Sequence, residues 1–157
     1  MNTNYVLAFA FGIGIVAGLR SLLAPAAVSW AVYLGWLALH DSPLAFMGSI
    51  VTVATFSLLA IGELIADLLP MVPKRTAPAP LAARILTGSL CGACLCVSAD
   101  HSLLIGALLG GVGGVMGAFT GYEVRRRLVS SLKIKDTFIA LLEDLIALGL
   151  AWLFVSR

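Results

Sequence analysis

The sequence predicts an all-α, polytopic transmembrane helical bundle, and two observations support that prediction. The 157-residue chain is 61% hydrophobic and only 11% charged, with a mean hydropathy of +1.05. Soluble domains carry about 25% charged residues, so this chain could not cover its surface with polar groups. Long apolar runs also fill nearly the whole chain, and short gaps between them hold most of the basic residues. The length predicts a single domain, residues 1–157.

Six apolar segments approach the length needed to cross a bilayer, which is about 20 residues, range about 17–25. The expected spans, in chain order, are residues 4–22, 25–40, 45–69, 81–98, 102–122 and 137–155. No charged residue precedes the first segment and no small-residue cleavage site follows it. We therefore expect a retained span there, not a signal peptide.

The first forty residues allow a second interpretation with five spans. Segment 25–40 is short, and Pro25 separates it from the first segment. Residues 4–40 could instead form one long helix, or a helix followed by an interfacial one. Trp30, Tyr33 and Trp36 would then make an interfacial stripe, because Trp and Tyr favour that depth. We prefer six spans, because five would move Arg20 into hydrocarbon, where a charge is costly.

The basic residues predict the orientation of the chain. With six spans, nine of the ten Lys and Arg residues fall on one side, and only Arg157 lies opposite. Lys and Arg in short loops mark the cytoplasmic side, so both termini should face away from it. The net charge of +2 is too small to indicate a nucleic-acid partner. Similar strings flank the second and fourth segments. They indicate either an internal repeat of two hairpins, as in some transporters, or chance similarity.

The charges within and beside the apolar segments are the candidate ligand-binding residues. Glu63 and Asp67 are spaced i, i+4 and share a helix face. Because two unpaired carboxylates would repel each other, we expect arginines to form ion pairs with them. Intramembrane charges are usually paired, and we expect Arg20 and Arg84 to bridge these two carboxylates. Other charges assigned to this cytoplasmic side are Arg75, Arg125, Glu143 and Asp144. This layer is either a structural network or a site for a proton, an ion or an anionic headgroup.

Two further features concern Arg75 and the glycines. Free N–H groups at the start of segment 81–98, with Arg75 and Arg84 nearby, would attract a phosphate or carboxylate. In segment 102–122, small residues recur every four positions, a spacing that lets helix backbones approach closely in lipid. The packing glycines are Gly106, Gly110, Gly114, Gly113, Gly117 and Gly121. We expect a tightly packed central or dimerising helix, and a glycine-lined pathway is the less favoured interpretation.

Motifs for catalysis and cofactors are weak. Cys91 and Cys94 have redox-motif spacing but fall in mid-segment, where an apolar thiol is inert, and no second pair completes a zinc site. The sequence has no P-loop, dinucleotide fingerprint or Ser-His-Asp arrangement. We therefore expect no cofactor, no metal and no enzymatic activity.

Four strings together resemble a known family. They are GLRSLLAPA at 18–26, GELIAD at 62–67, RTAP at 75–78 and LLEDLIA at 141–147. The chain resembles an uncharacterised family of small bacterial integral membrane proteins that carries a domain-of-unknown-function label. The resemblance implies a bacterial inner-membrane location, and it does not indicate any particular activity.

The leading hypothesis from the sequence is a small transporter or flippase-like protein. Its charged layer would bind a small anion or a lipid headgroup, or would relay a proton. Because so short a chain offers few helices to enclose a pathway, we expect a homodimer or another membrane-protein partner in the lipid bilayer. The alternative is a non-catalytic membrane scaffold or accessory subunit whose ion pairs are structural.

Overall fold

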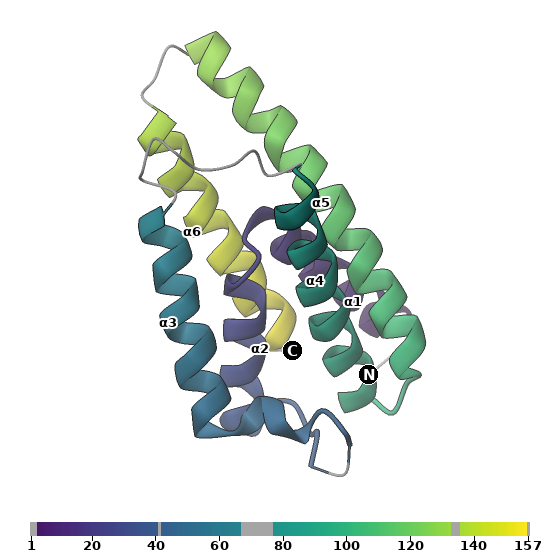
Figure 1. Cartoon of the computed structure of the whole chain (residues 1–157). Coiled ribbons are helices and arrows are strands. Elements are labelled where there is room, and N and C mark those ends of the chain that lie inside the picture. Colours follow the sequence, from purple (N-terminus) through teal and green to yellow (C-terminus); the bar gives the residue numbers. More distant parts are fainter. Residues whose placement is uncertain (1–2, 41, 67–76, 133–135, 157) are drawn as a thin grey trace.

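A computed structural model describes residues 3–40, 42–66, 77–132 and 136–156 of the chain (Figure 1). Within these ranges the chain forms six α-helices and one 3-10 helix and has no strands. The helices are α1 (Thr3–Leu19), α2 (Leu23–Tyr33), η1 (Ala45–Gly48), α3 (Ile50–Ala66), α4 (Pro78–Ser98), α5 (Leu103–Leu132) and α6 (Asp136–Val155). The predicted all-α architecture is therefore confirmed. Asp67 and Arg75 lie outside the described residues.

Successive α-helices run in opposite directions (Figure 1). The end of α1, the start of α2, the end of α3 and the start of α4 lie toward one end of the bundle, and the marked chain ends lie toward the other. With 30 residues, α5 is about 45 Å long at 1.5 Å per residue. Its C-terminal part therefore extends past the neighbouring helices (Figure 1).

Residues 20–22 separate α1 from α2, so residues 4–40 do not form one long helix. Pro25 explains the break, because in a continuous helix its ring would clash with the carbonyl of Ser21. In α2 the proline falls in the first turn, where a missing N–H costs nothing. The N-terminal segment predicted as 4–22 therefore ends at Leu19.

The predicted segment 25–40 is wrong in length, because α2 ends at Tyr33. Gly35 adopts a left-handed φ of 78°. The N–H of Trp36 donates to the carbonyl of Ala31 and the N–H of Gly35 to that of Val32, which is the Schellman pattern of a helix C-terminus. The 11 residues of α2 span about 16 Å, about half of the ~30 Å hydrocarbon thickness.

Two helices in the described ranges are long and apolar enough to cross a membrane, α4 over its full length and α5 over Leu103–Leu128. Shorter apolar helices cover Tyr5–Leu19, Leu23–Tyr33 and Ile50–Ala66. Length and composition alone thus give a weak indication of membrane association.

Glycines bring α1, α4 and α5 into backbone contact. A Cβ added at Gly88 of α4 would lie 2.5 Å from the carbonyl oxygen of Gly110 in α5. A Cβ added at Gly18 of α1 would lie 2.6 Å from the Cα of Gly117 in α5. Real Cβ atoms essentially never approach another atom within 3.0 Å, so only glycine fits at these positions. These three helices therefore form one close-packed unit.

Three more of the predicted packing glycines, Gly106, Gly113 and Gly114, also meet helices of the same chain. A Cβ added at Gly106 would lie 2.7 Å from the Cβ of Cys96, and one at Gly114 would lie 2.7 Å from the carbonyl oxygen of Arg84. A Cβ at Gly113 would lie 3.0 Å from the Cα of Gly14 in α1. These glycine faces of α5 are thus covered by α1 and α4, and they are not available to a second copy.

The hydrophobic core lies where α1, α2, α4 and α6 meet. Its buried members include Ile13, Val16, Val28, Met47, Cys91, Cys94, Ala147 and Ala151. The three cysteines are free thiols buried in the bundle. Helix α6 packs onto this core through Ala147, Ala151 and Val155, with Leu150 and Phe154 partly buried against it.

Candidate functional site

Among the described residues, Arg20 has the largest fully buried side chain, and it occupies the break between α1 and α2. Its Nε donates to Oδ1 of Asp144 in α6 at 2.5 Å, and its Nη2 forms an ion pair with the same carboxylate. The Arg20 side chain is 2% exposed and that of Asp144 is 17% exposed. Because a buried charge is stable only when paired, this contact fixes α6 against the end of α1.

Glu63, in the last turn of α3, binds the start of α2. Its carboxylate accepts hydrogen bonds from the N–H of Ser21 at 2.9 Å, the N–H of Leu22 at 2.9 Å and the Ser21 hydroxyl at 2.6 Å. Leu22 is the N-cap of α2, and its own side chain provides no cap. Because N–H groups at a helix start lack partners and favour negative charge, Glu63 caps α2 from a neighbouring helix.

Arg84 of α4 caps the C-terminal end of α1. Its Nε donates to the carbonyl of Gly18 at 2.9 Å, and its Nη1 donates to the carbonyl of Pro80 at 3.3 Å. Carbonyls in the last turn of a helix lack partners and favour a cation. Arg84 is 7% exposed, so its Nε provides a hydrogen-bond donor to the Gly18 carbonyl at a position that water does not reach.

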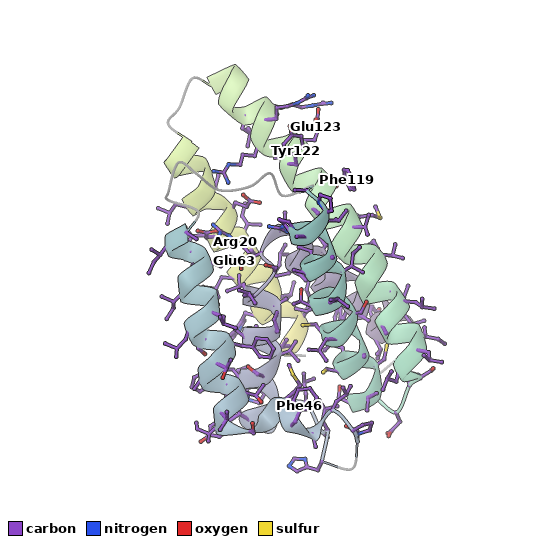
Figure 2. All side chains as sticks on the ribbon, viewed as in Figure 1. Arg20, Phe46, Glu63, Phe119, Tyr122 and Glu123 are labelled. Atoms are coloured by element: carbon purple, nitrogen blue, oxygen red, sulfur yellow. The ribbon has the colours of Figure 1, made fainter. Side chains whose placement is uncertain are left out.

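We call Arg20, Glu63, Arg84 and Asp144 the polar layer. They come from the α1–α2 break, α3, α4 and α6, and they all bind to each other or to residues 18–22. Figure 2 shows Arg20 and Glu63 at the same level of the bundle. The layer therefore joins four segments of the chain at one non-helical turn.

The expected bridges of Arg20 and Arg84 to Glu63 are wrong, because the carboxylate of Glu63 binds Ser21 and Leu22. Arg20 binds Asp144, and the expected bridges to Asp67 lie outside the described residues. The physical reason is the break in the helix, which leaves backbone N–H and C=O groups that the charged side chains must satisfy. Ser21, Leu22 and Gly18 were not expected in the site, although Pro25 signals a helix start just before it. The expected contribution of Arg75 lies outside the described residues.

A cleft with a volume of about 170 Å³ lies next to the polar layer, between α1, α5 and α6. Its lining is mostly apolar, with one cationic and one anionic residue: Leu19, Thr120, Gly121, Val124, Arg125, Leu128, Leu142, Glu143 and Ile146. Leu19 precedes Arg20 and Glu143 precedes Asp144, so the cleft adjoins the ion pair. Gly121, predicted as a packing residue, lines this cleft.

A second group of charges lies on the extending part of α5 (Figure 2). Glu123 accepts a hydrogen bond from Nη2 of Arg126 at 3.0 Å and from Nε of Arg127 at 2.7 Å. Both arginines are exposed, and exposed pairs of this kind contribute little to stability because water and salt screen them. They do not line the cleft.

In the part of the chain that the structure describes, no three His, Cys, Asp or Glu side chains are grouped to hold a metal ion. The site combines a buried ion pair, capped helix ends and a mostly apolar cleft.

Comparison with known proteins identifies a family whose description gives no function. No curated protein and no solved structure matches the chain. A family model described as a domain of unknown function, DUF4126, matches residues 7–156, which is nearly the whole chain. The chain therefore belongs to the DUF4126 family.

Proposed function

We propose that the protein is a multi-pass protein of the bacterial inner membrane, with its basic connections in the cytoplasm. The outward surface supports this setting, because several large aliphatic side chains are 69–71% exposed: Val51, Leu58, Leu86, Leu104 and Leu108. Phe119 also points away from the bundle and is 51% exposed (Figure 2). Apolar surface on this scale marks a membrane or protein contact, and lipid would cover it on several helices at once.

Within that setting, we propose a small transporter or flippase-like protein that binds a lipid headgroup or small anion. The observation that carries this proposal is the cleft, whose apolar walls hold Arg125 and Glu143 beside the polar layer. An amphipathic molecule needs this combination of an apolar wall and a few charged groups.

A mechanism follows from the unequal packing of the helices. The close backbone contacts make α1, α4 and α5 one rigid unit, whereas α6 meets that unit through side chains, including the Arg20–Asp144 pair. Rocking of one packed unit against another is a common route to alternating access. Movement of α6 about this pair would open and close the cleft that it shares with α1 and α5.

A structural scaffold is the second candidate, and a different observation favours it. The hydrogen bonds of the polar layer stabilise the α1–α2 break, as a purely structural network would. In this case α1, α4 and α5 would serve as a rigid support for a partner subunit, and the cleft would hold lipid without moving it.

Reconstitution into liposomes separates the two candidates. Fluorescent phospholipid in the inner leaflet is protected from an added reductant, so flipping appears as extra loss of fluorescence. If the protein is a transporter with its site in the cleft, wild-type liposomes should flip lipid faster than protein-free liposomes. Arg125→Gln should slow the flipping rate about tenfold or more, since a hydrogen bond to a charged group contributes about 1.5–3 kcal/mol. Arg126→Gln is the matched control, because Arg126 lies outside the cleft. A wild-type protein no faster than empty liposomes would refute the flippase proposal and leave the scaffold.

A further inference from the structure

A cavity with a volume of about 340 Å³ lies at the opposite end of the bundle from the polar layer. It is bordered by the N-terminal half of α1, the last turns of α4 and α6, and the segment that follows α2. The marked chain ends lie toward this end of the bundle as well (Figure 1). Sites that enclose a whole small molecule have volumes of roughly 300–1,000 Å³. The cavity is therefore large enough for a small free molecule, whereas the cleft between α1, α5 and α6 measures about 170 Å³.

The charge of the cavity lining is negative. Asp100 lies two residues beyond the end of α4, and it is the one charged residue among the described residues that line the cavity. In the part of the chain that the structure describes, no hydrogen bond or ion pair occupies its carboxylate. A ligand with a positive charge would therefore gain a partner in the cavity, and an anion would be repelled.

Two helix C-termini add to this negative potential. Ser98 is the last residue of α4 and Phe154 is the penultimate residue of α6, and both line the cavity. The C-terminal end of a helix carries a partial negative charge, and neither of these last turns contains a basic residue. Helix α1 contributes Val6 and Phe9, which lie beyond its first turn, where the opposite charge of a helix start has faded. The electrostatics of the cavity thus favour a cation.

Aromatic side chains from three segments determine which kind of cation fits. Phe9, Trp36 and Phe154 all line the cavity, and the ring centroids of Phe9 and Phe154 lie 5.6 Å apart. Aromatic faces attract organic cations, and Trp attracts them most strongly. A calcium or magnesium ion needs several oxygen ligands, whereas an organic cation needs one carboxylate and apolar walls for its body. The lining therefore matches an organic cation.

We propose that this cavity binds a small organic cation with an apolar body, such as an alkylated or aromatic ammonium compound. The positive group lies beside Asp100, and the apolar body lies against Phe9, Trp36 and Phe154. Asp100 has a left-handed φ of 57°, a conformation that Asn also adopts, so the turn itself does not require a carboxylate. The inference goes beyond the proposed function, because it uses neither the cleft between α1, α5 and α6 nor the polar layer.

The test uses the full chain, purified in an uncharged detergent. Binding of radiolabelled benzyltrimethylammonium is measured by equilibrium dialysis, and benzenesulfonate is the probe of similar size and opposite charge. Uptake by protein-free micelles is subtracted from both. We expect the cation to bind at least tenfold more tightly than the anion, equal to about 1.4 kcal/mol.

Substitutions assign the binding to the cavity. Asp100→Asn keeps the left-handed turn but removes the charge, so it should weaken binding of the cation about fivefold. Trp36→Leu should weaken it to a similar extent, about fivefold, because the cation loses an aromatic face. Glu123→Gln and Trp30→Leu are matched controls outside the cavity and should bind as the wild type does. Thermal unfolding of each variant is measured alongside, and Asp100→Asn decides the question if Trp36→Leu does not fold.

Three results would overturn the assignment. The first is that benzyltrimethylammonium does not bind the wild type above the micelle background, and the second is that benzenesulfonate binds as tightly as the cation. The third is wild-type affinity for the cation in Asp100→Asn. None of these results depends on lipid flipping. Flipping without cation binding would remove this inference and leave the proposed function in place, and cation binding without flipping would do the reverse.

Discussion

Substitution of Gly110 by alanine measures how closely α4 and α5 pack. An added Cβ would lie 2.8 Å from the carbonyl carbon of Gly88 and 3.1 Å from the Cα of Gly92, with the Gly88 oxygen nearer still. Ordinary van der Waals contact begins at 3.4 Å, so the helices would have to separate by at least 0.6 Å. These are backbone atoms, which cannot rotate aside as a side chain can.

The expected cost is near the upper end of overpacking, about 3 kcal/mol, and the better helix propensity of alanine offsets about 1 kcal/mol of it. A net loss of about 2 kcal/mol should lower Tm by roughly 4–8 °C for a chain of this size. Thermal unfolding of the purified protein in detergent, followed by circular dichroism, gives this shift.

Gly149→Ala provides the matched control, because an added Cβ there has no atom within 4 Å. It carries the same gain in helix propensity without the clash, so its Tm should rise or stay unchanged. If Gly110→Ala were as stable as Gly149→Ala, the close backbone packing of α4 and α5 would be wrong.

Other substitutions test the polar layer and the end of α2. Asp144→Asn should cost about 3–5 kcal/mol, because it removes the carboxylate that Nε and Nη2 of the buried Arg20 contact. The double variant Arg20→Met, Asp144→Leu should recover most of that loss, and additive single effects in thermal unfolding would contradict the pairing. Glu63→Gln should cost about 0.5–2 kcal/mol as a weakened helix cap, whereas the exposed Glu123→Gln should have little effect, and equal shifts in Tm would refute the capping role. Gly35→Ala should cost about 1–2 kcal/mol, because Gly35 has a left-handed φ, which strains an alanine backbone. An added Cβ would meet no atom within 4 Å, so no clash adds to this strain. An unchanged Tm would show that this turn is not needed for stability.

The predictability of each helix depended on what terminates it. Residues 137–155 matched α6 closely, because the apolar run and the helix end together. The predicted segment 102–122 stopped ten residues before the end of α5, since hydropathy ends where the charged turn begins. The helix continues there because Glu123 pairs with Arg126 and Arg127 at i, i+3 and i, i+4. In α2 the decisive signal was Gly35, whose backbone conformation outweighed a continuing apolar sequence.

The polar layer was predictable in its members and not in its contacts. Arg20, Glu63, Arg84 and Asp144 stand out in the sequence because each is a charge in or beside an apolar run. Their partners depend on where α1 ends, since that determines which backbone groups at residues 18–22 need hydrogen bonds. Charge pairing alone therefore gave the wrong partners for Glu63, which binds backbone N–H groups, and the expected pairs with Asp67 lie outside the described residues. The cleft could not be predicted at all, because it depends on the distance between α5 and α6.

Site-directed labelling tests the membrane arrangement most directly. In a variant without Cys91, Cys94 and Cys96, single cysteines are placed at His40 and at Arg126, which are both exposed and belong to opposite ends of the proposed bundle. A maleimide that cannot cross the membrane is added to intact cells. Labelling at position 40, with position 126 reacting only after permeabilisation, is the predicted result. Labelling of both positions from the same side would contradict the account.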